Sequence, residues 1–304
     1  MLHSGFVCFV GRPNAGKSTL TNALVGTEIA IASDKPQTTR HIVRGIVTLD
    51  DGQLVIMDTP GVHRPRTLLG ERLNQLVYDT WSEVDEIGVC LPCPEKIGPG
   101  DRFLISQIAA LSPRPVLVGL ATKVDAAAPE RVRNHLLDIQ KLESEFAIEW
   151  ADIVPTSAVT GENLDMVQDV LISHLPEGPA YDPDGEVTDE PTETLIAELI
   201  RQAALANARD ELPHSIAVTI EEMGLREGRP KDKPLLDIYA DIIVERDSQK
   251  PIVLGRGGSR LKEIGSQARQ RISRLVGTPV YLDLKVKVLK EWQRDPKALN
   301  RLGF

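Results

Sequence analysis

The sequence predicts two domains: an α/β domain with a mainly parallel sheet and helices on both faces, followed by a smaller α+β domain. Over residues 6–175, apolar runs of strand length alternate with helical patterns, which is typical of a parallel sheet. The alternation stops between Pro176 and Pro191, where four prolines and six acidic residues occur together. Beyond this break the order of elements changes and basic residues become frequent, which indicates a separate domain.

The elements of the first domain follow from hydrophobic periodicity and from turn residues. We expect strands at residues 6–10, 43–49, 54–57, 87–91, 115–121 and 152–155. We expect helices at residues 17–25, 68–81, 101–112, 129–146 and 163–175. Asp50-Asp51-Gly52 between two apolar runs predicts a hairpin, which adds one antiparallel strand at the edge. Residues 27–42 are polar and rich in turn formers, so we expect a mobile loop there.

Prolines and acids at residues 177–191 predict an extended linker between domains at residues 1–176 and 192–304. The second domain is long enough to form a core of its own. Its expected elements are a helix at 192–210, a strand at 215–222, a hairpin tip at 225–234, a strand at 235–246, a glycine-rich turn at 255–258, a helix at 260–276 and a strand at 280–288.

The composition is that of a soluble globular protein, with 304 residues of which 41% are hydrophobic and 26% are charged. No apolar run reaches the roughly 18 residues that a transmembrane helix needs, and the first residues lack the pattern of a secretory signal. Three cysteines are too few for a disulfide framework. We therefore expect a cytoplasmic protein, and a monomer.

Charge is distributed unevenly along the chain. The formal net charge is −9, but residues 250–304 contain 13 Lys or Arg against 4 Asp or Glu, a local charge of +9. Such asymmetry predicts an acidic body and a basic end that contacts polyanions.

Residues 11–18, Gly-Arg-Pro-Asn-Ala-Gly-Lys-Ser, match the P-loop pattern G-x-x-x-x-G-K-[ST] between a predicted strand and a predicted helix. In such a loop the backbone N–H groups surround phosphates, and the helix N-terminus adds positive potential. Lys17 is expected to reach the β- and γ-phosphates and Ser18 to bind Mg²⁺. The nucleotide contacts expected from this segment are Gly11, Asn14, Ala15, Gly16, Lys17, Ser18 and Thr19.

A second motif, Asp58-Thr59-Pro60-Gly61, follows the predicted strand at 54–57. Asp58 at a strand end can hold Mg²⁺ through a water molecule, and the Gly61 N–H can bind the γ-phosphate. A lone D-x-x-G is an ordinary turn, but its spacing from the P-loop makes a nucleotide site the better interpretation. We expect all four residues, including Thr59 and Pro60, to contact the nucleotide.

The base is predicted from Thr122-Lys123-Val124-Asp125, which follows the strand at 115–121. Asp125 can accept hydrogen bonds from guanine N1–H and the 2-amino group, a donor pair that adenine lacks, so GTP and GDP are the expected ligands. Thr122 stands where Asn is usual. We expect this departure to change the affinity for the nucleotide more than the choice of guanine. Ser157 and Ala158 are expected to complete the base pocket, with a helix-start turn as the alternative.

A G-x-x-G segment, Gly255-Arg256-Gly257-Gly258, lies in the basic end between helical patterns. Such a loop lets a nucleic-acid backbone approach closely, and KH domains clamp about four nucleotides in this way. A tight turn is the alternative. The expected RNA-binding residues are Gly255, Arg256, Gly257, Gly258, Arg260 and Lys262, with further charge from Arg269, Arg271 and Arg274.

Residues 11–18, together with Pro36-Gln37-Thr38-Thr39-Arg40 and residues 58–61, resemble the Era family of bacterial GTPases. Residues 244–258, residues 287–296 and the ending Leu302-Gly303-Phe304 resemble the KH domain of the same family. The resemblance covers nearly the whole chain. It implies an α/β P-loop GTPase domain followed by an α+β type II KH domain. It also matches Thr39 to the threonine that contacts Mg²⁺ when GTP is bound, with Thr38 as the alternative.

Turnover is expected to be slow, because Val62 stands where many GTPases place the glutamine that orients the attacking water. In related GTPases the asparagine that matches Asn14 helps to bind K⁺, so K⁺ is a candidate cofactor beside Mg²⁺; turn chemistry is the alternative explanation of Asn14. The catalytic residues are therefore expected to be Lys17, Asn14, Thr39 and Gly61.

The family resemblance implies binding near the 3′ end of small-subunit ribosomal RNA, with GTP timing release from the pre-30S particle during 30S assembly. One alternative is a GTPase that signals at the membrane surface, through a peripheral contact with the cytoplasmic membrane, or that acts in tRNA metabolism. Another is an RNA-binding scaffold with an inactive nucleotide site. The G-x-x-G segment favours RNA, because attraction to lipid needs charge but no backbone-clamping glycines. The acidic segment at 176–191 is long for the family.

Overall fold

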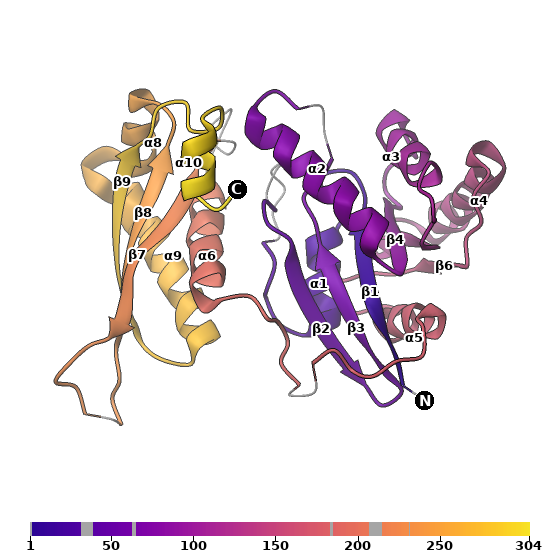
Figure 1. Cartoon of the computed structure of the whole chain (residues 1–304), viewed down its shortest axis with the longest axis horizontal. Coiled ribbons are helices and arrows are strands. Elements are labelled where there is room, and N and C mark those ends of the chain that lie inside the picture. The colour runs from indigo at the N-terminus through magenta and orange to yellow at the C-terminus, as the bar shows by residue number, and fades with distance from the viewer. Residues whose placement is uncertain (1, 32–38, 63–64, 183–184, 207–214, 231) are drawn as a thin grey trace. The chain divides into compact units, whose positions relative to one another are not determined.

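The computed structural model of the protein describes residues 2–31, 39–62, 65–182, 185–206, 215–230 and 232–304 (Figure 1). Pro36, Gln37 and Thr38, which belong to the family-like segment, lie outside the described residues. The chain forms two compact units, built mainly from residues 1–190 and from residues 191–304. Of the helices in the described ranges, none is long and apolar enough to cross a bilayer.

The first unit contains a six-stranded sheet in the order β2-β3-β1-β4-β5-β6. Its strands are β1 (His3–Val10), β2 (Val43–Leu49), β3 (Gly52–Asp58), β4 (Glu86–Pro92), β5 (Val116–Thr122) and β6 (Asp152–Pro155). β2 pairs antiparallel with β3, which confirms the predicted hairpin, and every other pairing is parallel. All the parallel strands therefore end at one edge of the sheet, where the predicted motifs follow them.

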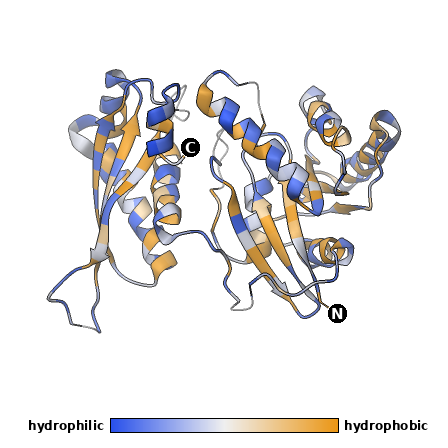
Figure 2. Cartoon of the chain, viewed as in Figure 1, coloured by the Kyte–Doolittle hydropathy of each residue, from blue (hydrophilic) through white to orange (hydrophobic). Residues whose placement is uncertain are grey.

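Helices cover both faces of this sheet. They are α1 (Lys17–Val25), α2 (Leu68–Glu83), α3 (Pro99–Ala109), α4 (Pro129–Phe146) and α5 (Leu164–His174). Trp81, Leu104 and Ile139 bring α2, α3 and α4 into one apolar cluster, and α1 and α5 form a second cluster on the opposite face. Hydrophobic residues concentrate on the strands and on one side of the helices (Figure 2), as amphipathic packing requires.

The helix predicted at residues 101–112 spans Pro99–Ala109. Proline suits the first helical position because its missing N–H would have no partner there. The Asp101 side chain then accepts the Gly98 N–H at 2.8 Å, which caps the helix. The sequence pattern located the apolar face of α3 but not this start.

Residues 176–190, which the composition marks as a linker, contact the edge of the first sheet in their described part. The Ile46 N–H on β2 donates to the Val187 carbonyl at 2.9 Å, and Arg44 pairs with Asp189 at 2.8 Å. The segment is extended and acidic, and it belongs spatially to the first unit up to Glu190.

The second unit contains a mixed three-stranded sheet in the order β7-β8-β9, antiparallel between the first two strands and parallel between the last two. Helices α6, α8 and α9 pack on one face through residues such as Ile200, Val253 and Ile264. The elements are α6 (Thr192–Ala206), β7 (Ala217–Leu225), β8 (Leu236–Val244), the 3-10 turns η2 (Asp247–Gln249) and η3 (Arg256–Gly258), α8 (Lys250–Leu254), α9 (Ser259–Val276), β9 (Val280–Val288) and α10 (Pro296–Arg301).

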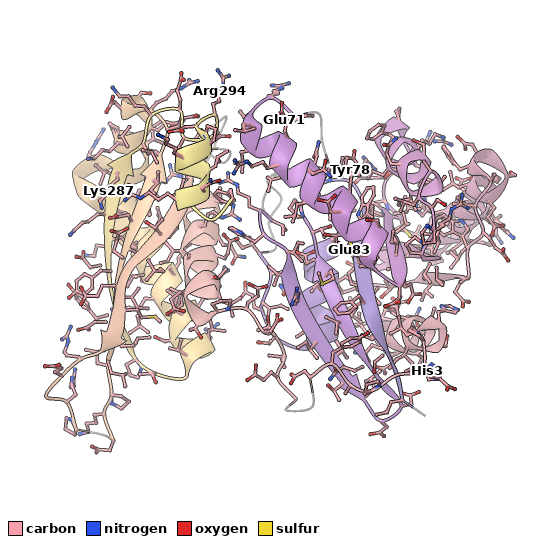
Figure 3. All side chains as sticks on the ribbon, viewed as in Figure 1. His3, Glu71, Tyr78, Glu83, Lys287 and Arg294 are labelled. Carbon is pink, nitrogen blue, oxygen red and sulfur yellow. The ribbon has the colours of Figure 1, made fainter. Side chains whose placement is uncertain are left out.

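On the other face of this sheet, Lys287 of β9 (labelled in Figure 3) forms an ion pair with the buried Asp241 of β8. The strand predicted at 235–246 ends at Val244, because residues 247–254 form η2 and α8 instead. Helix α8 is the helical segment that was expected before the G-x-x-G turn, whereas α10 was not predicted from the sequence. The described part of the helix predicted at 192–210 ends at Ala206.

Candidate functional site

The P-loop is a tight turn between β1 and α1. A side-chain carbon at Gly11 would lie 2.7 Å from the Cys90 carbonyl oxygen, so the loop packs directly on β4. Asn14 has a φ of 65° and Gly16 a φ of 95°, both in the left-handed region that glycine and asparagine tolerate. No side chain caps the α1 N-terminus at Gly16, which leaves this helix end suited to an anion.

Lys17 lies inside this turn and is 8% exposed. Its Nζ donates to the carbonyl oxygens of Gly11 at 3.0 Å and Arg12 at 3.2 Å. Burial lowers the pKa of Lys17, although the nearby Asp58 opposes this effect. The ammonium is thus held in position by the loop before any phosphate is present.

Three oxygen-bearing side chains meet beside Lys17. Ser18 Oγ donates to Asp58 Oδ2 at 2.8 Å, and Thr39 Oγ1 lies 3.3 Å from both Ser18 Oγ and Asp58 Oδ2. Asp58 Oδ1 is buried and has no hydrogen-bond partner among the described residues. Burial raises the pKa of Asp58 to about 6, against the opposing effects of Ser18 and Lys17. An orphaned carboxylate oxygen beside two hydroxyls fits a hard divalent cation such as Mg²⁺.

The rest of the D-x-x-G segment lies at the same place. Thr59 and Pro60 are buried, and a side-chain carbon at Gly61 would lie 3.9 Å from Lys17 Nζ. Gly61 therefore lies next to the lysine, as a γ-phosphate contact requires. Val62 packs against the apolar cluster of α2, α3 and α4.

The predicted base-reading residues converge from β5 and β6. Asp125 Oδ1 accepts a hydrogen bond from Ser157 Oγ at 2.6 Å. Ser157 Oγ in turn accepts the N–H groups of Val159 and Thr160, both at 3.2 Å, so the loop after β6 orients the Asp125 carboxylate. Ala158 follows Ser157 in this loop and is half-buried.

Thr122 and Lys123 connect the base side of the site to the P-loop. Thr122 is 4% exposed, and its hydroxyl donates to the Ala15 carbonyl at 2.7 Å. A side-chain carbon at Gly16 would lie 3.9 Å from Lys123 Cε. Thr122, which stands where Asn is usual, therefore bonds to the P-loop main chain through its hydroxyl. Thr19, the remaining predicted residue, occupies the first turn of α1.

The G-x-x-G segment forms an exposed turn between α8 and α9. Gly255, Gly257 and Gly258 have φ angles of 70°, 60° and 78°. A side-chain carbon at Gly257 or Gly258 would meet no atom within 4 Å, whereas one at Gly255 would lie 2.7 Å from Arg260 Cβ. Arg256 and Gly257 are exposed, so the outer side of the turn is open to a ligand backbone.

A groove extends from this turn along α9 and beside β9. It is lined by Gly258, Leu261, Lys262, Gly265, Ser266, Arg269, Leu282 and Leu284. Leucine side chains form apolar surface, and two exposed cations lie on the same groove. This combination suits stacked bases whose phosphates run along a basic edge.

Of the six predicted RNA-binding residues, Gly258 and Lys262 line the groove, whereas Gly255, Arg256, Gly257 and Arg260 do not. The lining residues that were not named from the sequence are Leu261, Gly265, Ser266, Leu282 and Leu284, although the α9 residues recur at helical spacing from Gly258 onward. Arg260 points elsewhere, because its Nη1 donates to the Ile252 carbonyl of α8 at 3.3 Å.

Two family models match the chain. One is described as a 50S ribosome-binding GTPase and matches residues 6–123, and the other is described as a KH domain and matches residues 211–293. The GTPase model ends within the base-reading motif, and the KH model includes the G-x-x-G segment and the groove.

Relatives and solved structures cover nearly the whole chain. GTPase Era of a Nocardioides species is 62% identical over 301 residues, covering 99% of this chain and 96% of the relative. GTPase Era of Mycolicibacterium smegmatis is 60% identical over 301 residues, covering 99% and 98%. A crystal structure of an Aquifex aeolicus Era variant bound to GDP and AlF4⁻ matches with a TM-score of 0.92 at 36% identity, covering 99% of each chain. A crystal structure of Era with MgGDPNP and nucleotides 1506–1542 of 16S ribosomal RNA also has a TM-score of 0.92 at 36% identity, covering 100% of this chain and 99% of that one.

Proposed function

The chain belongs to the GTPase Era family and is a GTPase, and we propose that its GTP cycle times the occupancy of small-subunit ribosomal RNA during 30S assembly. The observation that carries this proposal is the pairing of a complete nucleotide site in the first unit with a basic groove behind a G-x-x-G turn in the second. We take residues 1–176 as the GTP-binding domain and residues 192–304 as the KH domain.

In the phosphate site, the loop from Gly11 to Ser18 binds phosphate oxygens through backbone N–H groups. Lys17, held by the loop carbonyls of Gly11 and Arg12, contacts the β- and γ-phosphates, and the Gly61 N–H binds the γ-phosphate. Ser18 and Thr39 would supply hydroxyl ligands for Mg²⁺, and Asp58 would hold it through water. When bound, the metal would neutralise negative charge on the β- and γ-phosphates.

Base selection is assigned to Asp125, oriented by Ser157, with Lys123 and Ala158 completing the pocket. A carboxylate accepts two guanine N–H groups and repels a base that offers acceptors there. Asp125→Asn should therefore weaken GDP binding by about 100-fold, because one acceptor becomes a donor. Isothermal titration with GDP and ADP measures this, and unchanged preference for GDP would refute the assignment.

Hydrolysis is proposed to be slow without a partner, because Val62 has no group to orient water and packs, partly buried, against an apolar cluster. We assign Asn14 to a K⁺ ion that stabilises the charge developing between the phosphates. Turnover should be faster in KCl than in NaCl, and Asn14→Ala should remove the difference. Equal rates in both salts for the unaltered protein would exclude the K⁺ role.

The second unit is proposed to bind RNA along the groove of α9 and β9. Glycines of the G-x-x-G turn allow the backbone to approach, Lys262 and Arg269 contact phosphates, and leucines contact bases. The crystal structure of Era with nucleotides 1506–1542 of 16S ribosomal RNA supports the 3′ end of that RNA as the ligand. The pre-30S particle is the partner that we propose, because this RNA belongs to the small subunit.

Binding of that 3′-terminal RNA fragment, with GDP or a GTP analogue present, tests the RNA assignment. Lys262→Ala with Arg269→Ala should reduce affinity at least about tenfold, because two phosphate contacts are lost. Lys141→Ala with Arg114→Ala removes two exposed cations from the first unit and is the matched control. If the groove variant binds RNA normally but loses binding to anionic vesicles, the membrane-surface alternative replaces this function.

A further inference from the structure

A charged network joins the P-loop to two acidic residues that lie outside every nucleotide motif. Arg12, the second residue of the loop, donates from Nε to Asp101 Oδ1 at 2.7 Å and from Nη2 to Glu95 Oε2 at 3.1 Å. Asp101 lies 89 positions away in the first turn of α3, and its side chain is 1% exposed. A buried carboxylate fixed to a loop cation forms a strong, charge-assisted contact.

The Asp101 carboxylate has little freedom to move. Its second oxygen accepts the Gly98 N–H at 2.8 Å, so rotation of the side chain would leave the α3 N-terminus uncapped. A side-chain carbon at Gly100 would lie 2.9 Å from Arg12 Cδ, so the arginine stem packs directly on the α3 backbone. Helix α3 therefore fixes the position of the Arg12 side chain.

Glu95 is positioned from a third element. Arg131 of α4 donates from Nε to the Cys93 carbonyl at 3.0 Å and from Nη2 to the Glu95 carbonyl at 2.5 Å. The segment that carries Glu95 is thus tied to α4. Glu95 is itself half-exposed, so its contribution to holding Arg12 is smaller than that of Asp101.

The main chain of Arg12 connects this network to the reacting groups. Its carbonyl oxygen accepts Lys17 Nζ at 3.2 Å and the Ala15 N–H at 3.1 Å. Asn14, with its left-handed φ, lies two residues further along. A shift of the Arg12 backbone would therefore displace the lysine and the outer turn of the loop together.

We propose that Asp101 is a positioning residue for GTP hydrolysis, which acts through Arg12 to hold the outer turn of the P-loop and the carbonyl that orients Lys17. The inference rests on the GTPase activity and adds to it residues outside the nucleotide motifs. Misplacement of a catalytic group by about 1 Å can cost about 100-fold in rate, whereas nucleotide affinity is spread over many backbone contacts. We call the Asp101–Arg12 contact the clamp. Its loss should therefore lower kcat more than it lowers GDP affinity.

A competing role for Arg12 is an arginine finger supplied within the chain. Its Nε and Nη2 are directed to Asp101 and Glu95, away from the phosphate loop interior that Lys17 occupies. The two roles make opposite predictions for Asp101. If Arg12 is an arginine finger, removal of the Asp101 carboxylate would free it and preserve or raise kcat. If Asp101 instead positions the loop through Arg12, the same removal would loosen the loop and lower kcat.

The test is single-turnover GTP hydrolysis with saturating Mg²⁺ and KCl, corrected for the fraction of protein that binds GDP. Asp101→Asn, Arg12→Ala and the double variant should each lower kcat by about tenfold, with the GDP dissociation constant changed by less than about threefold. Arg12→Lys should recover part of the rate. Glu145→Gln is the matched control, because it removes a 2.7 Å ion pair between Arg102 of α3 and Glu145 of α4 that does not include a P-loop residue.

An unchanged rate for Asp101→Asn, or losses that multiply in the double variant, would overturn the proposal. So would a loss of rate that is fully explained by a smaller nucleotide-binding fraction. If the unaltered protein itself fails to hydrolyse GTP, the activity is refuted separately, and amide exchange then tests the clamp. Asp101→Asn should speed exchange of the N–H groups at residues 11–16, and equal exchange in both proteins refutes the clamp.

Discussion

The two glycine-rich loops of this protein each lead into a helix, but one is enclosed and the other is open. The helix that follows each loop has a left-handed glycine at its N-terminal cap, Gly16 with φ 95° and Gly258 with φ 78°, and no side-chain cap. In the P-loop, Lys17 is buried, and Gly11 lies so close to Cys90 that an added side-chain carbon would be 2.7 Å from the Cys90 carbonyl oxygen. In the G-x-x-G loop the outer residues are exposed, and added side-chain carbons would mostly meet open space.

This difference teaches what each loop is suited to hold. Both present the N–H groups of a helix start, which attract phosphate. An enclosed loop surrounds the end of a polyphosphate and excludes water, which strengthens each electrostatic contact. An open loop lets a polymer backbone pass across it, so its glycines serve the approach of a ligand rather than internal packing.

The strongest test of the enclosed site is Lys17→Ala. A buried cation that stabilises transition-state charge typically contributes about 100-fold or more to kcat. We expect at least that loss in GTP turnover, with RNA binding in the absence of nucleotide unchanged. A loss below about threefold would contradict the assignment. Lys141→Ala, at an exposed position on α4, serves as the control.

Gly11→Ala tests whether the close packing of the P-loop on β4 requires glycine at position 11. The added carbon would lie 2.7 Å from the Cys90 carbonyl, and such overpacking costs about 1–3 kcal/mol of unfolding free energy. Urea unfolding without nucleotide measures this cost. Gly178→Ala, where an added carbon meets nothing within 4 Å, should change stability by less than about 0.5 kcal/mol. Equal stability of the two variants would contradict the distinction.

Gly257 provides a matched pair of variants for the open loop. Asparagine and aspartate have nearly the same shape and both tolerate left-handed φ, so a comparison of Gly257→Asn with Gly257→Asp isolates charge. The aspartate variant should bind the RNA fragment about tenfold more weakly than the asparagine variant, because it repels phosphate. GTP turnover without RNA should be equal in both. Equal RNA affinity would mean that no phosphate approaches this turn.

The smallest expected effect is the change of GDP affinity with pH. Burial raises the pKa of Asp58 to about 6, so its ionised fraction falls as the pH drops through that value. Between pH 7.5 and 5.5, Mg²⁺-dependent affinity for GDP should weaken about fourfold, because the protonated carboxyl cannot hold the metal. Asp58→Asn should abolish this dependence. A flat profile for the unaltered protein would show that Asp58 does not titrate in this range.

Sequence patterns predicted both candidate sites because each depends on local backbone requirements. Glycines that need left-handed φ, a lysine one residue before the P-loop serine and carboxylates at strand ends leave signals that are contiguous in the chain. The hairpin at Asp50-Asp51-Gly52 was likewise predicted, since its turn residues follow one another. The nucleotide, its base and the kind of polymer that the second unit binds could be proposed from such segments alone.

Contacts between distant segments were decided by the tertiary structure. Asp101 meets Arg12 across 89 positions, and Leu282 and Leu284 complete the groove of α9 only because β9 pairs with β8 beside that helix. Asp189 forms an ion pair with Arg44 on β2, a contact that the composition, which indicated an extended linker between domains, did not predict. The physical reason is the same in each case: side-chain type reports what a residue can bind, but strand order and packing decide which partners lie within reach.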